Sequence, residues 1–329
     1  MSEKDCWVGF DLGGTKMLAV VYDEKFKQLG RKRRRTKGHE GVKAGLDRII
    51  ETIELALEEA EVAPDRVRGI GVGCPGPLDL DAGVILEAPN LGWENAPLKK
   101  TLEKHFGCIA AVANDVDVGV YGEYRFGAGK KARCVVGVFP GTGIGGGCVY
   151  QGNIFRGRMT SCMEVGFMKV MADGPRAGLG PPGTLEAVAS RLAISAQCAQ
   201  AAFRGQAPNL RKAAGTDLSN IRSGILAAAI EAGDKEVERI VRDAAGYIGY
   251  AVGSLVNVLA PDVVVLGGGL VEALPELYVT AVRKKALQTA LPSYHKTFEI
   301  VPAKLGDDTS VLGAAAWVEH VCEEDIKSI

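Results

Sequence analysis

The sequence predicts an α/β protein made of two similar halves, and three observations lead to this prediction. Apolar strand-like runs alternate with amphipathic helical stretches, the pattern of a layered α/β architecture. A strand, a glycine turn and a second strand follow one another at residues 6–23 and again at 133–151. Glycine is in excess, with 43 of 329 residues against about 23 in a chain of average composition. Glycine is favoured where backbone turns sharply or approaches a ligand, so the surplus indicates binding loops.

The first half begins with a hairpin and continues with crossover helices. The turn of the hairpin is Gly13-Gly14-Thr15-Lys16. We expect strands at 6–11, 17–23, 27–36, 67–73 and 108–113, and helices at 46–60 and 97–106.

The second half repeats the hairpin and then becomes largely helical. A strand at 133–139, a glycine turn at 141–147 and a return strand at 148–151 are followed by one buried strand at 262–266. We expect helices at 184–203, 219–231, 234–259, 272–288 and 311–328. The domains expected are 1–116, with the last helix (311–329) packing back on it, and 117–310, separated by a cleft.

Composition and charge exclude several classes of protein. The net charge of −1 and the 47% hydrophobic content argue against disorder and give no bulk attraction to nucleic acid or anionic membranes. The N-terminus lacks a signal-peptide pattern, and the helix at 234–259 carries too many charges to span a bilayer. The eight cysteines are scattered without a Cys-x-x-Cys pair. A cytoplasmic protein is expected.

The first glycine turn suits phosphate. Successive N–H groups of a tight glycine turn can bind phosphate oxygens, and Thr15 and Lys16 add a hydroxyl and a charge. Asp11, at the end of the preceding strand, is a candidate to hold Mg²⁺ through water. An ordinary Gly-Gly hairpin is the alternative.

The second glycine turn also suits a ligand. Residues 141–147 contain five glycines besides Thr142 and Ile144. Gly141, Gly143 and Gly146 match the G-x-G-x-x-G pattern of dinucleotide sites, but that pattern requires a helix immediately afterwards, and the following residues are strand-like. The P-loop pattern is absent as well.

Asn114-Asp115 follows the strand at 108–113 and opens a helical stretch. A carboxylate at this position can accept the proton of an attacking hydroxyl as a general base. The alternative is that Asp115 only caps the helix.

These motifs together resemble the ROK family of glucokinase-type sugar kinases, within the actin/hexokinase ATPase superfamily. The resemblance covers essentially the whole chain in order. It rests on FDLGGTK (10–16), GVGCPGPLD (71–79), APNLGW (88–93), VANDVD (112–117), GTGIGGG (141–147), MEVGF (163–167), GTLEAVAS (183–190), LAPDVVVLGGGL (259–270) and GDDTSVLGAA (306–315).

The resemblance implies a fold and a set of roles. The fold would be two actin-like ATPase (ribonuclease H-like) domains, with mixed sheets flanked by helices and a cleft between them. Asp115 would be the catalytic base of an ATP- and Mg²⁺-dependent sugar kinase. The implied sugar ligands are Asn90, Asn114, Glu164 and Glu186, and the implied nucleotide-binding residues are Asp11, Gly13, Gly14, Thr15, Lys16, Gly141, Thr142, Gly143, Gly267 and Gly268. The partners would be a sugar and ATP, and the resemblance favours a homodimer.

The chain departs from the family pattern at the sugar site. Family members usually carry a His three residues after the sugar-binding Glu, where this chain has Phe167. They also carry a short Cys-rich loop for structural zinc, whereas residues 171–186 hold neither Cys nor His, and Thr184 occupies an expected Cys position. We therefore expect no zinc of this type. The lost hydrogen-bonding contact favours another hexose, an amino or deoxy sugar or another polyol over glucose, and the alternative is that another side chain replaces the contact.

Three other functions stay open. The missing His and Cys residues suit a catalytically weak sugar-binding or regulatory protein, and the glycine pattern at 141–146 suits a dinucleotide oxidoreductase. The basic run 31–37 suits a nucleic-acid binder, although it falls on an expected strand, where charge protects a sheet edge. Repressors related to these kinases carry an added N-terminal DNA-binding domain, and we expect none here because the phosphate loop already begins at Asp11.

Overall fold

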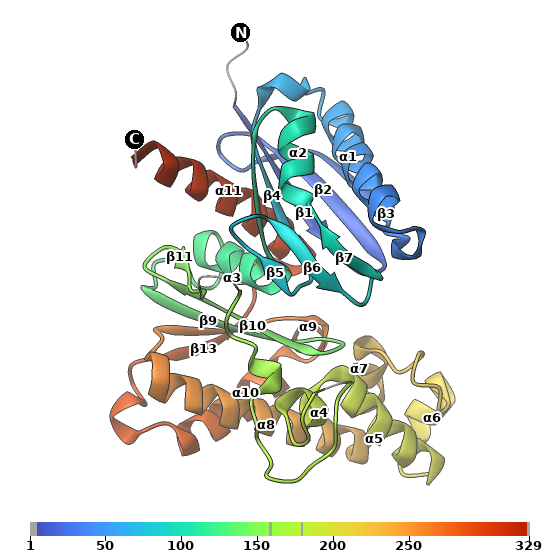
Figure 1. Cartoon of the computed structure of the whole chain (residues 1–329). Coiled ribbons are helices and arrows are strands. Elements are labelled where there is room, and N and C mark those ends of the chain that lie inside the picture. The colour runs from blue at the N-terminus through green and yellow to red at the C-terminus, as the bar shows by residue number, and fades with distance from the viewer. Residues whose placement is uncertain (1–4, 158–159, 179, 328–329) are drawn as a thin grey trace. The chain divides into compact units, whose positions relative to one another are not determined.

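The structure, a computed structural model, describes residues 5–157, 160–178 and 180–327 (Figure 1). The chain forms two compact units. The first contains the described residues up to Lys131, Gly147–Cys162 and the described residues from Asp307 onward, and the second contains Ala132–Gly146 and Met163–Gly306. The first unit therefore extends beyond the expected boundary near residue 116, because the helix after this boundary packs within that unit.

The first unit is built on a five-stranded sheet of order β3-β2-β1-β4-β8. Its strands are β1 (Cys6–Leu12), β2 (Lys16–Tyr22), β3 (Gln28–Arg35), β4 (Val67–Cys74) and β8 (Ile109–Asn114). β1 is antiparallel to β2 and parallel to β4, which is in turn parallel to β8. The carboxyl ends of β1, β4 and β8 therefore meet at one edge of the sheet.

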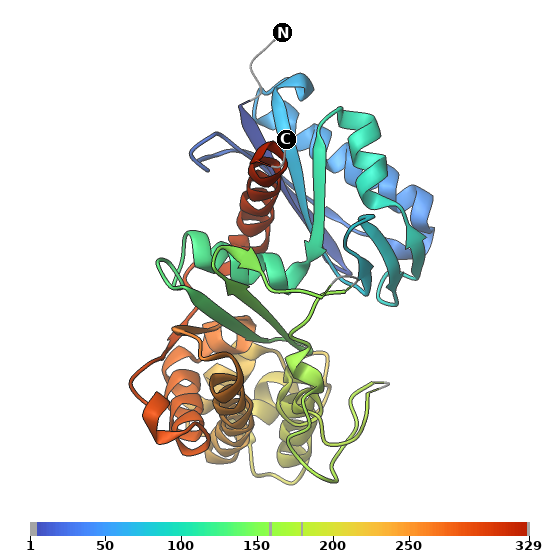
Figure 2. The same ribbon diagram turned by 60° about the vertical axis from the view of Figure 1, so that its left-hand side comes forward.

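Helices cover both faces of this sheet (Figures 1 and 2). They are α1 (Val42–Glu59), α2 (Leu98–Phe106), α3 (Asp115–Arg125) and α11 (Thr309–Lys327). α11 approaches so closely that a Cβ on Gly9 or Gly71 would overlap a carbonyl oxygen of this helix. A Cβ on Gly122 of α3 would lie 2.7 Å from the carbonyl oxygen of Thr309. α3 and α11 thus share one face of the sheet, and α1 packs on the other.

The basic run lies on the edge strand β3 as expected. Arg31 pairs with Asp308 at 3.1 Å, and Arg34 pairs with Glu51 at 2.6 Å. Because several of its charges pair with carboxylates of the same unit, the run fits a charged edge strand.

A small antiparallel sheet was not expected in the segment after β4. It consists of β5 (Leu78–Asp79), β6 (Val84–Ala88) and β7 (Trp93–Ala96). No strand was expected between residues 73 and 97, because these strands are short and half polar. The β6–β7 turn carries Asn90, one of the proposed sugar ligands.

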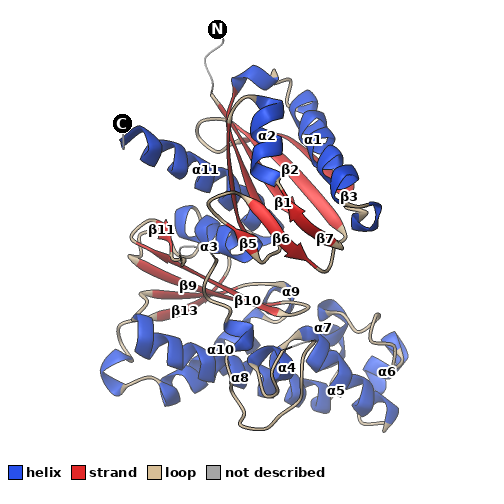
Figure 3. Ribbon diagram, viewed as in Figure 1, coloured by secondary structure: helices blue, strands red, loops and turns tan. Residues whose placement is uncertain are grey.

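The second five-stranded sheet has the order β11-β10-β9-β12-β13. Its strands are β9 (Cys134–Pro140), β10 (Ile144–Tyr150), β11 (Asn153–Ile154), β12 (Val263–Leu266) and β13 (Glu299–Pro302). The second unit is rich in helices (Figure 3): α4 (Leu185–Ala189), α5 (Arg191–Phe203), α6 (Pro208–Ala214), α7 (Ser223–Glu231), α8 (Lys235–Leu259), α9 (Gly269–Ala273) and α10 (Pro275–Thr289).

The helix expected at 184–203 is two helices. Ser190, with φ −68° and ψ 160°, ends α4 and caps α5 by accepting a hydrogen bond from the Ala193 N–H. The helix expected at 272–288 is likewise divided into α9 and α10. Strand β13 and helix α6 were not expected at all.

The glycine turn expected at 141–147 is shorter than predicted. β10 already begins at Ile144, so Gly145, Gly146 and Gly147 are strand residues. Close packing explains two of them: a Cβ on Gly146 would lie 2.7 Å from the Met163 carbonyl oxygen, and one on Gly147 would lie 2.9 Å from Val120 Cγ2.

Among the described residues, no helix has both the length and the apolar character that a bilayer crossing requires.

Candidate functional site

The residues expected at the site occur as two sets, one in each unit. The first unit holds Asp11, Gly13, Gly14, Thr15, Lys16, Asn90, Asn114 and Asp115. The second unit holds Gly141, Thr142, Gly143, Glu164, Glu186, Gly267 and Gly268.

Strand register brings the polar residues of the first set to one sheet edge. Asp11 of β1 is opposite Gly73 of β4, and the next β4 residue, Cys74, is opposite Asn114 of β8. A Cβ on Gly73 would lie 3.3 Å from the Cα of Asp115. Glycine at position 73 therefore lets the start of α3 approach the strand ends, where Asp11 also lies.

Two carboxylates thus share a poorly hydrated position. Burial, with a further contribution from the Asp115 charge, raises the pKa of Asp11 to about 7. Burial also raises the pKa of Asp115, and the Val116 N–H that donates to its Oδ1 at 2.9 Å partly opposes this rise. A carboxyl group with a raised pKa is stabilised by a bound proton or a nearby cation.

The cap of α3 is Asn114, not Asp115. Asn114 Oδ1 accepts hydrogen bonds from the N–H groups of Val116 at 2.9 Å and Asp117 at 3.4 Å. Asp115 is thus the first residue of the helix, not its N-cap, although its Oδ1 also accepts the Val116 N–H. Capping through Oδ1 leaves the Asn114 side-chain amide group to donate to a ligand hydroxyl.

The hairpin Gly13–Lys16 is held in shape by a residue that the sequence analysis missed. The Gly13 N–H donates to the Lys16 carbonyl at 3.0 Å. Thr36, which is fully buried, donates from its N–H to the Thr15 carbonyl at 2.9 Å and from Oγ1 to the Gly13 carbonyl at 2.7 Å. Its own carbonyl accepts from Arg48 Nη1 at 2.8 Å. The only signal in the sequence was a Thr at the end of the basic strand.

Asn90 lies beside this hairpin. A Cβ on Gly14 would lie 3.3 Å from Asn90 Cβ. The β6–β7 turn therefore brings a proposed sugar ligand next to a proposed phosphate loop within one unit.

In the second unit, the turn Gly141–Gly143 is held from α5. The Gly141 N–H donates to the Gly143 carbonyl at 2.8 Å, and the Arg191 N–H donates to the Gly141 carbonyl at 2.9 Å. Arg191 Nη2 also donates to Thr142 Oγ1 at 2.9 Å. Space around the Cβ position of Gly141 is open, with the nearest atom 4.0 Å away, so a phosphate can approach this backbone.

Glu186 lies against the same turn. Its Oε2 accepts the Ile144 N–H at 2.9 Å, and a Cβ on Gly143 would overlap this oxygen. Gly143 is therefore explained by the carboxylate of Glu186, whereas the open side of Gly141 suits a ligand. The sequence analysis placed Glu186 at the sugar only.

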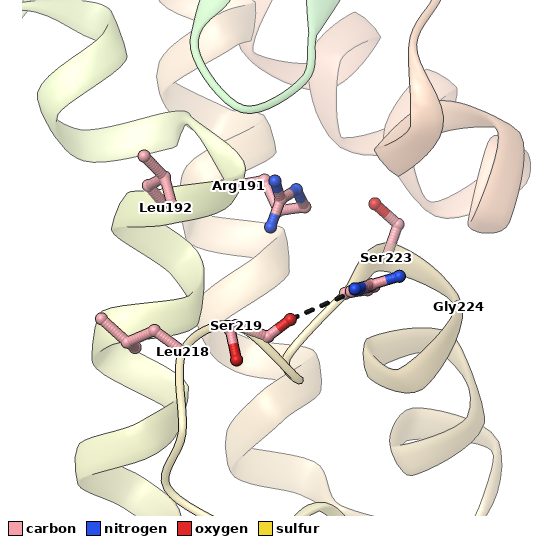
Figure 4. Close-up of a pocket in the computed structure, with 7 residues that line it drawn as sticks. Arg191, Leu192, Leu218, Ser219, Ser223 and Gly224 are labelled. Carbon is pink, nitrogen blue, oxygen red and sulfur yellow. Dashed lines mark hydrogen bonds between the residues drawn. The ribbon is translucent and has the colours of Figure 1, made fainter. Parts of the chain in front are cut away.

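A cavity of about 610 Å³ opens next to these residues (Figure 4). It is lined by Arg191, Leu192, Leu218, Ser219, Arg222, Ser223 and Gly224, and Arg222 Nε donates to the Ser219 carbonyl at 3.3 Å. A Cβ on Gly269 would lie 3.5 Å from Ser223 Oγ. Gly268, with φ +82°, precedes α9 and would clash with the Pro140 carbonyl if it carried a side chain. Gly269, which follows β12, thus lies near Ser223, and Thr142 of the turn 141–143 is hydrogen-bonded to Arg191. Ser223 and Arg191 both line the cavity.

Glu164 begins a short 3₁₀ helix, Val165–Phe167, on which Phe167 is half exposed. A Cβ on Gly180 would lie 3.0 Å from the Phe167 ring. Backbone hydrogen bonds close the adjoining loop: the Val170 N–H donates to the Gly183 carbonyl at 2.9 Å, and the Gly183 N–H donates to the Pro175 carbonyl at 2.8 Å. These backbone hydrogen bonds hold the described part of the loop.

No cluster of three or more His, Cys, Asp or Glu side chains suited to a metal ion occurs in the described part of the chain. A cation held by Asp11 would therefore take most of its ligands from water and substrate oxygens, which is the usual coordination of Mg²⁺.

Comparison with known proteins agrees with this architecture. The ROK family profile matches residues 7–321. The "Glucokinase" of Thermotoga maritima is 32% identical over 321 residues, which cover 95% of this chain and 97% of the relative. The "Xylose repressor" of Caldicellulosiruptor bescii is 27% identical over 82% of this chain and 67% of its own length.

Solved structures show the same fold. A ROK family glucokinase from Streptomyces griseus, crystallised with glucose and AMPPNP, matches with a TM-score of 0.81 and 28% identity, covering 95% of this chain and 98% of the other. The ROK hexokinase of Thermus thermophilus matches with a TM-score of 0.78 and 33% identity, at the same coverage. The predicted actin-like ATPase fold and the predicted enzyme class, a sugar kinase, are confirmed. On its sequence, fold and site geometry, the chain belongs to the ROK family.

Proposed function

We propose that this protein transfers the γ-phosphate of MgATP to a sugar hydroxyl, with Asp115 as the general base. The placement of Asp115 is the observation that carries the proposal. It lies at the carboxyl edge of the first sheet near Asp11, and Asn114 takes over the helix cap. The raised pKa of Asp115 suits a group that accepts a proton from a hydroxyl.

The reaction needs little chemistry from the protein besides this proton transfer. Asp115 takes the hydroxyl proton as the sugar oxygen forms its bond to the γ-phosphorus, and the bond from that phosphorus to the bridging oxygen of ADP breaks. The remaining groups position the reactants and balance the charge of the phosphates.

The nucleotide is assigned to the glycine loops and the cavity of the second unit. Backbone N–H groups of Gly14 and Gly143, with Thr15, Lys16 and Thr142, would bind phosphates. Gly13 and Gly141, whose N–H groups close the two turns, would let the backbone approach the nucleotide closely. The cavity by Ser223 and Arg191, about 610 Å³, is large enough for a nucleoside. Gly267 and Gly268 would lie on the adenosine side.

Magnesium fits the carboxylates of the first unit. Asp11 has a pKa raised to about 7 by burial and by Asp115, so a divalent cation held by Asp11 through water would relieve the repulsion between the two groups. When bound, Mg²⁺ would neutralise phosphate charge.

The sugar is assigned to Asn90, Asn114, Glu164 and Glu186, whose amides and carboxylates suit hydroxyl groups. Phe167 cannot hydrogen-bond through its side chain and is half exposed. We infer a preference for a sugar other than glucose, namely another hexose, an amino or deoxy sugar or another polyol. We also expect a cytoplasmic homodimer without zinc, nucleic-acid or membrane partners.

The alternative is a catalytically weak regulator, and the xylose repressors among the relatives motivate it. A panel of sugars in a coupled ADP-release assay separates the two functions. The kinase proposal expects turnover with at least one sugar. Sugar binding without turnover across the panel would favour the regulator.

Asp115→Ala tests the proposed base. We expect loss of detectable phosphoryl transfer, at least the roughly 10²–10⁴-fold that a general base supplies, while MgAMPPNP binding by calorimetry survives. Asp47→Ala, which removes an exposed aspartate of α1, should retain full turnover. Retained turnover in Asp115→Ala would refute the assignment.

A further inference from the structure

We propose that Glu186 positions the second phosphate loop through one carboxylate oxygen and serves the sugar with the other. This inference rests on the proposed function and deepens it, because it makes one side chain a link between the two substrates. The resemblance to sugar kinases assigns Glu186 to the sugar alone.

The contacts of Glu186 carry the proposal. Oε2 accepts the N–H of Ile144, the residue that follows the turn Gly141–Gly143. The same oxygen fills the space that a Cβ on Gly143 would need, and lies 3.4 Å from the Cβ position of Gly166. The carboxylate is therefore wedged between the phosphate loop and the 3₁₀ helix that follows Glu164.

The surrounding backbone fixes Glu186 in this place. The Leu185 N–H donates to the Met168 carbonyl at 2.8 Å, and the Val170 and Met171 N–H groups both donate to the Gly183 carbonyl. These bonds fix the backbone at the start of α4. The backbone of Glu186 is therefore fixed in place while its side chain extends to the turn Gly141–Gly143. A Cβ on Gly166 would overlap the Ile144 carbonyl, so the 3₁₀ helix packs directly on the start of β10.

Coupling between the substrates follows. A sugar hydroxyl that donates to Oε1 would hold the carboxylate in the orientation in which Oε2 receives the Ile144 N–H. Binding of the sugar would then reduce the freedom of the loop and raise its affinity for the nucleotide, and the nucleotide would raise sugar affinity by the same factor.

Two substitutions at position 186 test this without any sugar present. In Glu186→Ala the loop loses its acceptor, and we expect MgAMPPNP affinity, measured by calorimetry in sugar-free protein, to fall about 10-fold. In Glu186→Gln the amide oxygen can still accept the Ile144 N–H, so nucleotide affinity should stay within about 2-fold. Glu164→Ala, at the neighbouring proposed sugar ligand, is the matched control and should alter sugar affinity with little change for the nucleotide.

The outcomes separate the two levels of the proposal. If Glu186→Ala binds MgAMPPNP as the unchanged protein does, Glu186 does not position the loop, although the kinase assignment stands. If the unchanged protein binds no adenine nucleotide and phosphorylates no sugar, the proposed function itself is wrong. A fall in nucleotide affinity that is equal in the Ala and Gln variants would contradict the role given to Oε2.

Discussion

At the scale of single residues, Thr36 holds the proposed phosphate loop Gly13–Lys16 in shape without being one of the residues assigned to the ligand. Its hydroxyl and N–H donate to two carbonyls of the hairpin that contains Gly13 and Thr15, and its side chain is fully buried. A buried carbonyl that loses its donor costs about 1–3 kcal/mol. Thr36 is thus expected to affect both the stability of the protein and the shape of the loop.

Thr36→Val keeps the shape of the side chain but removes the donor to the Gly13 carbonyl. We expect the free energy of unfolding to fall by about 1–3 kcal/mol, and KM for ATP to rise more than KM for the sugar. Urea denaturation and steady-state kinetics measure the two effects. Thr36→Ser, which keeps the hydroxyl, should restore KM for ATP. An unchanged KM for ATP in the Val variant would show that the loop does not need this bond.

At the scale of elements, the long helix α8 combines a buried face with glycines that contact α10. A Cβ on Gly249 would lie 2.6 Å from the Val282 carbonyl, and one on Gly253 would lie 2.8 Å from that of Ala286. These backbone atoms cannot move away without shifting α10. Gly246, on the same helix, faces only the side chain of Lys285, at 3.6 Å.

Alanine at positions 249 and 246 should therefore have opposite effects. We expect Gly249→Ala to destabilise the protein by about 1–3 kcal/mol through overpacking. Gly246→Ala should be neutral or stabilise it by up to about 1 kcal/mol, because alanine favours a helix over glycine. Thermal denaturation of both variants measures the difference. Equal melting temperatures would contradict the close approach of α8 and α10.

At the scale of the whole molecule, the shared carboxylate position lowers stability at neutral pH. Asp11 has a folded-state pKa of about 7 against 3.8 for the ordinary group. Between these values the folded state binds more protons than the unfolded state, so this group's contribution to the free energy of unfolding is lost as pH rises through the window. A bound cation would offset the loss.

Asp11→Asn should remove this pH-dependent penalty. We expect the metal-free variant to be more stable than the unchanged protein at pH 7.5, by roughly 1–4 kcal/mol, and nearly equal to it at pH 4. Urea midpoints at both pH values measure the difference, with Asp47→Asn as an exposed control. If Asp11→Asn is less stable than the unchanged protein at pH 7.5, the surroundings of Asp11 do not disfavour its charged form.

The sequence predicted the fold and the first glycine turn well, and the second only in part, because apolar periodicity and glycine turns are local signals. It did not predict β5–β7, because strands of two to five residues show little periodicity. It also did not predict the break at Ser190, because the residues on both sides of Ser190 follow one helical pattern. It could not reveal the roles of Thr36, Arg191 or the second contact of Glu186. Those contacts, Thr36–Gly13, Glu186–Ile144 and Arg191–Thr142, join residues 23, 42 and 49 positions apart. Only the folded chain brings them together.

The position of α11 has a consequence for the order in which the protein can be made. This helix closes the face of β1 and β4 so tightly that Gly9 and Gly71 have no room for a side chain. During translation the central strands of the first unit therefore stay uncovered while residues 132–306 are made, for on the order of 10–35 s at about 5–20 residues per second. This face of the sheet stays uncovered until α11 has been made, so we expect the nascent chain to depend most on a chaperone during that interval.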